Sequence, residues 1–286
     1  MPYLVDTCFR EFYGKINLPG DHRTTANARR ESVVRYLKDL NVIDSFATGS
    51  IPRYTALSGS SDLDVIVVLH YGNHIKGKKP SQVLQRVRTA LAGHRNELRR
   101  NGQAVTLYYK TWPNVDVVPV SRVVDDDGQI CYYTVPDMKT ETWLQSRPRR
   151  HSRNMRERAG SVGEKFRQVI CMMKHWNRTN GNLLESYHIE AMALQAINYD
   201  SEYSWMVSSF FKEMSSRVRS GFYYLGDDIS VYLTWQVRDR VVNMLSSAAE
   251  IASTAWYHTY GEHNEHEKAI GLWRDIFGYQ FPKHGS

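Results

Sequence analysis

The segment 62–69 constrains the fold of this chain most, because it combines two carboxylates with a buried strand. Asp62 and Asp64 stand at the start of residues 63–69, which are otherwise aliphatic and mostly β-branched. Such a run is typical of a strand covered on both faces. Since alternate side chains of a strand share a face, the two carboxylates are expected side by side. Their repulsion predicts a bridging divalent cation such as Mg²⁺ or Mn²⁺.

A third aspartate lies in another apolar segment. Asp116 is the one charged residue of 115–120, and a lone buried carboxylate is costly unless something compensates its charge. If this strand neighbours 63–69, Asp62, Asp64 and Asp116 converge. Such a cluster suits two metal ions about 3.5–4 Å apart, as in phosphoryl transfer. The alternative is a polar strand end that faces solvent.

The dipeptide Gly49–Ser50 follows a short predicted strand, 45–48. Glycine allows a ligand to approach the backbone closely, and the N–H groups of such a turn are suited to a phosphate. The sequence therefore predicts a phosphate contact near the two aspartates.

The two halves of the chain differ in their patterns. The first half mixes helices through 33–40 and 81–99 with strands at 104–109, 115–120 and 130–135. The second half is helical, over 162–179, 186–199, 202–219, 229–256 and 262–277. We expect an α+β fold with a mixed sheet, in which 1–145 form a catalytic lobe and 146–286 a helical lobe. The active site is expected in the cleft between them.

The composition is that of an ordinary globular protein, with 42% apolar and 23% charged residues. The longest purely aliphatic run, 65–69, is far shorter than the roughly 20 residues of a membrane helix. Asp6 and Arg10 stand where a secretory signal needs apolar residues. The three cysteines are widely spaced and form no Cys-x-x-Cys pair. These features predict a cytoplasmic protein with reduced, mostly buried thiols and no membrane contact.

The chain is basic, with a formal net charge of +7, which favours polyanionic partners such as nucleotides or nucleic acid. Seven cationic or histidine side chains lie within 147–158. This run suits either a nucleic-acid contact or a solvated surface, and no aromatic residue interleaves it as in a single-strand stacking platform.

The ordered set of Gly49–Ser50, Asp62-x-Asp64 and Asp116 resembles the DNA polymerase β-like nucleotidyltransferase superfamily. Further segments are similar to the cGAS/DncV-like nucleotidyltransferases, the cyclic-oligonucleotide synthases of bacterial CBASS anti-phage signalling. These segments are 49–55, 143–148, 173–177, 186–190 and 277–282. The resemblance extends from about residue 36 to residue 282 and includes the polymerase β-like fold of the catalytic lobe.

The resemblance implies that Asp62, Asp64 and Asp116 are catalytic and bind two ions of Mg²⁺ or Mn²⁺. It also implies that Asp116 helps to deprotonate the attacking hydroxyl group. By the same resemblance, the chain is a template-independent nucleotidyltransferase. It joins ribonucleoside triphosphates into a cyclic di- or trinucleotide and releases pyrophosphate. The implied protein is a monomer, and a separate effector protein responds to its product.

The resemblance further assigns nucleotide contacts. Gly49, Ser50, Lys174 and Ser186 are implied to contact phosphates, and Tyr187 to stack on a nucleobase. A lysine suits a polyphosphate, and base stacking on an aromatic ring stabilises a complex by about 1–3 kcal/mol. From the residues alone, Lys174 also suits a solvated helix surface, Ser186 a helix cap and Tyr187 the core.

One loop departs from the family. Many members have an Asp-Pro element followed by paired asparagines where this chain has Gly226, Asp227, Asp228 and Ile229. We therefore expect no base-selective contact from this loop. Asp227 and Asp228 are expected to cap a helix that begins near Ile229.

Two other classes of function stay open at this point. The first is a nucleotidyltransferase that acts on a small molecule or on an RNA end. The second is a non-catalytic module that binds nucleotides or RNA with the same fold. Nucleic acid is compatible with all of these readings and is required by none.

Overall fold

A computed structural model describes residues 4–59, 62–94, 96–261 and 263–284. Ser60 and Ser61, directly before the aspartate pair, lie outside these ranges, as does Glu262, the first residue of one predicted helix. The described residues form two compact units. One is Leu18–Arg153, and the other consists of the residues before and after that range.

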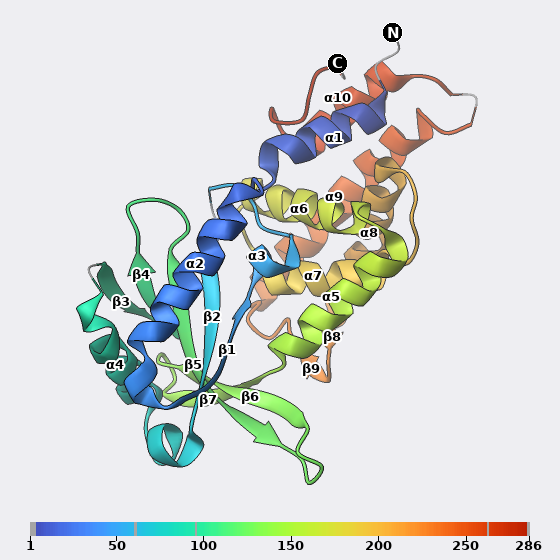
Figure 1. The fold of residues 1–286 in the computed structure, drawn as a ribbon. Coiled ribbons are helices and arrows are strands. Elements are labelled where there is room, and N and C mark those ends of the chain that lie inside the picture. The colour runs from blue at the N-terminus through green and yellow to red at the C-terminus, as the bar shows by residue number, and fades with distance from the viewer. Residues whose placement is uncertain (1–3, 60–61, 95, 262, 285–286) are drawn as a thin grey trace. The chain divides into compact units, whose positions relative to one another are not determined.

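The unit Leu18–Arg153 is built on a seven-stranded sheet. Its strands are β1 (Val42–Thr48), β2 (Leu63–Leu69), β3 (Glu97–Asn101), β4 (Ala104–Tyr108), β5 (Val115–Val124), β6 (Ile130–Asp137) and β7 (Thr142–Ser146). The order is β1-β2-β5-β4-β3, with β6 paired to β5 and β7 paired to β6. Strands β2 and β5 are parallel, and the other pairs described in this sheet are antiparallel. The sheet is therefore mixed, as predicted (Figure 1).

The two faces of this sheet carry different side chains. On β2, Leu63, Val65 and Val67 pack in one apolar cluster with residues of α2 (Asp21–Tyr36) and α4 (Pro80–Ala90). Ile66 and Val68 pack in a second cluster with residues of β5 and β6. Because side chains alternate along a strand, Asp64 shares the face of Ile66 and Val68.

The other unit is mostly helical. It contains α1 (Val5–Ile16), α6 (Lys165–Thr179), α7 (Ser186–Ala196), α8 (Tyr203–Arg217), α9 (Trp235–Tyr257) and α10 (His266–Phe277). A small ribbon of β8 (Tyr223–Tyr224) and β9 (Asp227–Asp228) joins α8 to α9. Helix α5 (Pro148–Val162) includes the boundary between the two units. The predicted order along the chain, a sheet-containing half followed by a helical half, is confirmed.

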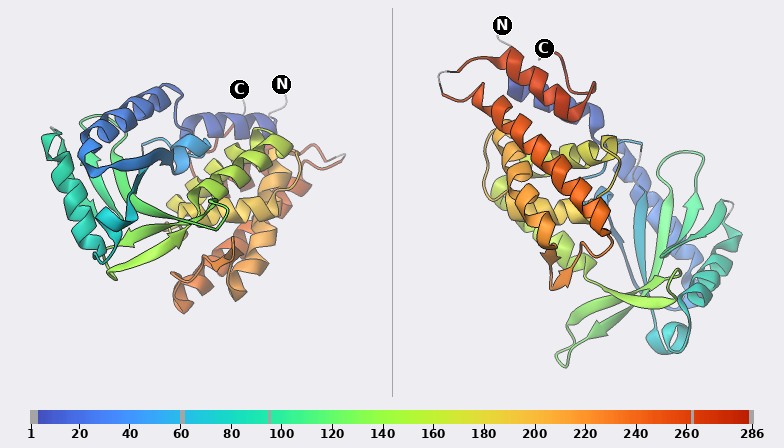
Figure 2. Two further views of the ribbon diagram at one scale, coloured as in Figure 1. Left: turned by 60° about the horizontal axis from the view of Figure 1, so that its bottom comes forward. Right: turned by 180° about the vertical axis from the view of Figure 1, so that it is seen from behind.

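An aromatic cluster ties the first helix of the chain to the last residues. The ring of Phe9 lies 5.0 Å from the rings of both Trp273 and Phe281, and 5.7 Å from that of Tyr203. Helices α1 and α10 lie side by side in both views (Figures 1 and 2). The helical unit is thus assembled from both ends of the chain.

The compact units differ from the domains predicted from sequence, 1–145 and 146–286. Helix α1 belongs to the helical unit, and residues 146–153 belong to the sheet unit. The domain boundary stays a prediction, because a compact unit is defined by its contacts and a domain by its capacity to fold alone.

Several predicted helices have wrong bounds. The helix predicted over 81–99 ends at Ala90 in α4, and residues 97–101 form edge strand β3. The helix predicted over 162–179 is interrupted at Gly163, whose φ of 98° is incompatible with a continuous helix. The helix predicted from Ile229 begins at Trp235 instead.

Asp227 and Asp228 therefore do not cap this helix. Thr234 does, since its hydroxyl accepts a hydrogen bond from the N–H of Val237 (3.4 Å). The carboxylate of Asp228 instead accepts hydrogen bonds from the N–H groups of Phe222 (3.3 Å) and Ser230 (2.9 Å). It thereby fixes the loop that follows β9.

Cys8 and Cys171 are buried, Cys131 is exposed, and none of the three forms a disulfide within the described residues. Mostly buried thiols are the expectation from sequence. Among the helices of the described residues, none is both long and apolar enough to span a bilayer.

Candidate active site

Asp64 and Asp116 lie directly opposite each other on neighbouring strands. Each is the second residue of its strand, and the parallel register of β2 and β5 pairs Asp64 with Asp116. Paired residues of a parallel ladder project to the same face, so the two carboxylates are neighbours. The sequence analysis predicted that the aspartates converge if these two strands are neighbours, and β2 and β5 are neighbours.

Asp62 precedes β2 and lies near the same strand end. The next residue, Leu63, donates its N–H to the carbonyl of Asn114 (2.9 Å), immediately before β5. The negative charge of Asp62 is close enough to raise the pKa of Asp116. All three aspartates therefore lie at the start of the β2–β5 pair.

Thr106 supports Asp116 from its other side. Strand β4 places Thr106 opposite Asp116, and the hydroxyl donates a 2.5 Å hydrogen bond to Oδ1 of Asp116. Thr106 is buried. The sequence analysis missed this residue, although a single hydroxyl within the apolar segment 104–107 was a signal that something polar lies opposite it.

The environment of Asp116 disfavours its charge. Burial raises the pKa of Asp116, the charge of Asp62 raises it further, and the hydrogen bond from Thr106 lowers it. The net effect is a raised pKa. A bound cation would offset both the burial and the repulsion.

The donor set is chemically suited to a hard divalent cation, because it consists of carboxylate oxygens on adjacent strands. As the side chains are placed, no three His, Cys, Asp or Glu residues within the described ranges are grouped closely enough to hold a metal ion. Asp64 and Asp116 are thus the paired core of the site, with Asp62 within electrostatic range.

Gly49 lies close to Asp64, and this close approach is possible because glycine has no side chain. It follows Thr48, which the antiparallel register of β1 and β2 places opposite Asp64. The backbone of Gly49 is left-handed, with φ of 80°, and a Cβ there would lie 1.8 Å from Oδ2 of Asp64. Ser50 begins the short helix α3 (Ser50–Arg53), whose Ile51 is buried. The structure therefore places Gly49–Ser50 next to Asp64.

Lys174 lies in α6 and is buried. Its Nζ donates a 2.7 Å hydrogen bond to Oε1 of Glu190 in α7, and both side chains are almost fully buried. The alternative of a solvated helix residue is therefore wrong for Lys174. Sequence analysis did not predict Glu190 as its partner.

Ser186 and Tyr187 are the first two residues of α7. Ser186 is exposed and forms no capping hydrogen bond, and the residue at the cap position is Glu185. The capping alternative for Ser186 is therefore wrong. Tyr187 is half-buried, with its ring 5.8 Å from that of Tyr224.

The predicted site residues thus fall into two groups. Asp62, Asp64, Asp116, Gly49 and Ser50 belong to the sheet unit. Lys174, Ser186 and Tyr187 belong to the helical unit. The nucleotide and metal contacts assigned to both groups stay predictions.

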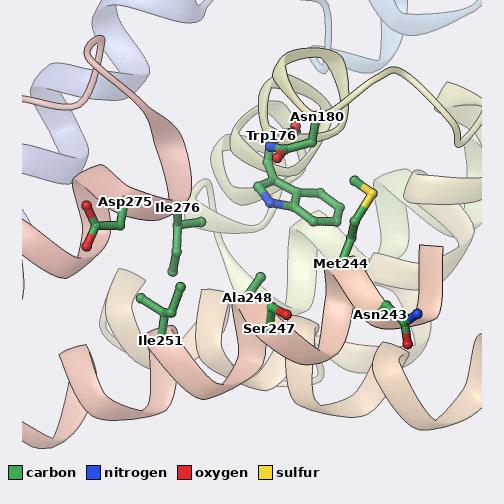
Figure 3. A pocket seen from close by; sticks show the side chains of 9 residues that line it. All are labelled: Trp176, Asn180, Asn243, Met244, Ser247, Ala248, Ile251, Asp275 and Ile276. Carbon is green, nitrogen blue, oxygen red and sulfur yellow. Dashed lines mark hydrogen bonds between the residues drawn. The ribbon is translucent and has the colours of Figure 1, made fainter. Parts of the chain in front are cut away.

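The helical unit also contains a pocket of about 280 Å³ between α6, α9 and α10 (Figure 3). Its walls include the indole of Trp176, the thioether of Met244 and the side chain of Ile276. None of the predicted site residues lines it. This pocket is therefore separate from the predicted site.

The family model described as the Second Messenger Oligonucleotide or Dinucleotide Synthetase domain matches residues 4–159. The match includes β2, β5 and all three aspartates, and it spans more than half of the chain. The chain belongs to this synthetase family. The predicted membership of the cGAS/DncV-like nucleotidyltransferases is confirmed.

Similar proteins agree with this family. A cyclic AMP-AMP-AMP synthase of Acinetobacter sp. is 24% identical over 269 residues, covering 85% of this chain and 74% of the relative. The structure of E. coli MS115-1 CdnC with ATP has a TM-score of 0.75 and 19% identity, covering 96% of this chain and 98% of that one. The crystal structure of the Vibrio cholerae DncV cyclic AMP-GMP synthase, a prokaryotic cGAS homologue, has a TM-score of 0.67 and 13% identity, covering 96% and 97%.

These findings confirm two predictions at the level of the family. The fold is the α+β nucleotidyltransferase fold of these synthetases, and the chain is a nucleotidyltransferase of the cyclic-oligonucleotide-synthase type. The reading as a purely non-catalytic module is thereby disfavoured.

Proposed function

We propose that this synthetase condenses ribonucleoside triphosphates into a cyclic di- or trinucleotide. A 3′- or 2′-hydroxyl attacks the α-phosphorus of a triphosphate, a new P–O bond forms, and the bond to the pyrophosphate leaving group breaks. A second attack of the same kind closes the ring of a dinucleotide, a third closes that of a trinucleotide, and each attack releases one pyrophosphate. The observation that carries the proposal is the Asp64–Asp116 pair, in register on parallel strands and next to Gly49.

In this proposal Asp62, Asp64 and Asp116 would hold two divalent ions, Mg²⁺ or Mn²⁺. When bound, such ions supply positive charge that stabilises the attacking and leaving oxygens of phosphoryl transfer. The all-carboxylate donor set supports this assignment.

The protein residues have separate tasks. Asp116 accepts the proton of the attacking hydroxyl. Thr106 holds Oδ1 of Asp116 in place through its hydrogen bond. Gly49 has no side chain, so its backbone N–H group and those of the following turn lie close to Asp64, where a phosphate group is expected.

The helical unit contributes the remaining contacts in this proposal. Ser186, exposed at the start of α7, contacts a phosphate group, and Tyr187 stacks on a nucleobase. Lys174 contacts phosphate with the ammonium that also binds Glu190. These three roles rest on the family resemblance of the segments 173–177 and 186–190.

We further propose that the cyclic product is a second messenger of anti-phage signalling in the cytoplasm. A separate effector protein then responds to it, and the synthetase itself acts as a monomer. The names of the relatives, a cyclic AMP-AMP-AMP synthase and a cyclic AMP-GMP synthase, support the class of product.

The proposal is tested by product analysis. Purified protein is incubated with Mg²⁺ and all four ribonucleoside triphosphates, treated with phosphatase, and the resistant products are identified by mass spectrometry. We expect a species of two or three nucleotides without a terminal phosphate. Single and paired nucleotides then identify the bases.

Two variants make the test specific. Asp64→Asn keeps the shape of the side chain but removes its charge, and we expect the rate to fall at least about 100-fold, as when electrostatic stabilisation of a transition state is lost. Asp126→Asn, at an exposed hairpin tip, is the matched control and should retain the parent rate. Equal rates for Asp64→Asn and the parent contradict the proposal. Nucleotide transfer to an RNA end or a small molecule would favour the alternative acceptors.

A further inference from the structure

The hydroxyl of Tyr232 joins two groups at the start of α7. It accepts a hydrogen bond from the N–H of Glu185 (2.9 Å) and lies 2.9 Å from Nδ1 of His188. Tyr232 comes from the loop between β9 and α9, more than forty residues along the chain. It therefore connects this loop to the helix whose first residues are Ser186 and Tyr187.

The second contact is a hydrogen bond between the phenol oxygen of Tyr232 and Nδ1 of His188, and the tautomer of the ring decides which of the two atoms donates. Burial lowers the pKa of His188 to about 4, so the ring is neutral at pH 7.

The arrangement resembles a capping box in which the hydroxyl of Tyr232 bridges the cap residue and the third residue of the helix. In an ordinary capping box, the side chain of the third helical residue binds the N–H of the cap residue directly. Here the cap residue is Glu185 and the third helical residue is His188. The phenol of Tyr232 bridges the two groups, so a distant loop completes the cap of α7.

The loop that presents Tyr232 is itself held in place. Ser230 donates its hydroxyl to Asp228 (2.6 Å) and accepts the N–H of Phe222 (3.0 Å), and Arg238 of α9 donates to Ser230 (3.2 Å). The ring of Phe222 packs against His188 at 5.1 Å. The hydroxyl of Tyr232 is thus presented by an ordered loop.

We propose that Tyr232 is a positioning residue, which fixes the first turn of α7 and thereby the nucleotide contacts of Ser186 and Tyr187. The inference rests on the roles that the proposed function gives to those two residues. Tyr232 itself does not need to touch the substrate. It acts through the backbone of Glu185 and the ring of His188.

The test compares Tyr232→Phe with Tyr223→Phe. The first variant loses the bridging hydroxyl and keeps the ring. The second removes a hydroxyl from the exposed Tyr223 of the neighbouring ribbon. Amide hydrogen exchange is measured at residues 185–188 in the nucleotide-free protein, and equilibrium dialysis measures the Kd for ATP and for GTP. Product assays give KM and kcat.

We expect Tyr232→Phe to exchange its Glu185 amide about fivefold to tenfold faster, because a helix cap is lost. The Kd and KM for the bound nucleotide should rise by a similar factor, with kcat within about twofold of the parent. Tyr223→Phe should match the parent in every measurement. A third variant, His188→Asn, keeps a side-chain amide with both a donor and an acceptor near the position of Nδ1, and it should keep the slow exchange of Glu185.

The outcomes separate this inference from the proposed function. Faster exchange with unchanged Kd and KM overturns the positioning role and leaves the proposed function intact. Unchanged exchange overturns the bridge itself. A parent that binds ATP or GTP without forming product contradicts the proposed chemistry, while a weaker Kd in Tyr232→Phe still supports positioning. If the parent binds neither nucleotide, the dialysis is repeated with CTP and UTP, and a parent that binds none of the four overturns both.

Discussion

At the scale of single residues, the clearest prediction concerns the effect of Gly49→Ala on activity. Gly49→Ala would place a Cβ 1.8 Å from Oδ2 of Asp64, so the carboxylate must move. Because active-site groups displaced by about 1 Å lose about 100-fold in rate, we expect at least that loss of product formation. The rate of nucleotide consumption under saturating Mg²⁺ measures it.

Gly102→Ala is the matched control for this substitution. Gly102 also has a left-handed backbone, with φ of 64°, but a Cβ there meets nothing within 4 Å. Both substitutions place a side chain at a positive φ, and the strain is greater at Gly49, whose ψ of −167° is adopted almost only by glycine. Only Gly49→Ala also disturbs the aspartate, so the two activities are compared per folded protein. Similar activities of the two variants would show that the contact with Asp64 is irrelevant.

The acidic residues of the site could be predicted from sequence, but the hydrogen-bond and ion-pair partners of the predicted site residues could not. Alternation along a strand predicts that Asp62 and Asp64 share a face. Thr106 supports Asp116 only because β4 lies next to β5, and strand neighbours are not encoded in local spacing. Glu190 was likewise missed as the partner of Lys174, since a pair between two helices leaves no local pattern.

At the scale of elements, α6 and α7 are joined by the buried Lys174–Glu190 pair. Lys174→Met removes the ammonium that lies 2.7 Å from the Glu190 carboxylate. We expect the free energy of unfolding to fall by about 3–5 kcal/mol, because a buried charge loses its partner. Urea unfolding followed by circular dichroism measures this change.

Two further variants are compared with Lys174→Met to show whether the lost ion pair causes the change in stability. The double substitution Lys174→Met with Glu190→Met should recover at least about 2 kcal/mol, because no charge is then left buried. The exposed pair of Glu213 and Arg217 in α8 is the control, and Arg217→Met should cost less than about 1 kcal/mol. A double variant that is stable but inactive would support the phosphate contact of Lys174. A double variant less stable than the single one would refute the ion-pair argument.

His188 makes the stability of α7 depend on pH. Burial lowers its pKa from 6.5 to about 4 in the folded protein. Between these values the unfolded chain binds a proton that the native protein does not, so stability is complete above pH 6.5 and falls as the pH decreases. The loss from this group approaches about 3 kcal/mol near pH 4.

Unfolding in urea at pH 7, 5.5 and 4.5 tests this dependence. The parent should lose stability more steeply than His188→Asn, which has no titrating ring. His263→Asn, at an exposed position, should keep the slope of the parent. Parallel curves for the parent and His188→Asn would show that His188 is not a buried neutral base.

Apolar elements could be predicted from sequence better than polar ones. Strands β2 and β5 have runs of β-branched residues, and both were located. Strand β3 is an edge strand with the sequence Glu-Leu-Arg-Arg-Asn and mostly exposed side chains, so it carries no apolar alternation. Its first three residues, 97–99, were instead assigned to the preceding helix.

At the scale of the whole molecule, the aromatic cluster around Phe9 holds both ends of the chain in one unit. Phe9→Ala removes a fully buried ring that contacts Trp273 and Phe281. We expect a loss of about 3–5 kcal/mol in the free energy of unfolding. Hydrogen exchange should accelerate in α1 and α10, and the amides of β2 and β5 should change least.

Phe9→Leu is the milder comparison, because it keeps apolar volume, and it should cost less than Phe9→Ala. Equal acceleration in the sheet unit and the helical unit would show that the protein opens as a single cooperative body. The membership of α1 in the helical unit could not be predicted, since its aromatic partners lie more than 160 residues away in sequence.

The interleaved order of the two units has a consequence for biosynthesis. Leu18–Arg153 is a continuous stretch, so during translation every strand of the large sheet has left the ribosome before most of the helical unit exists. Helix α1 is made before the sheet unit, whereas Trp273 and Phe281, which cover Phe9, are made after it. In a nascent chain stalled before α10, the ring of Phe9 therefore lacks these two partners, and a chaperone that binds apolar segments would act there.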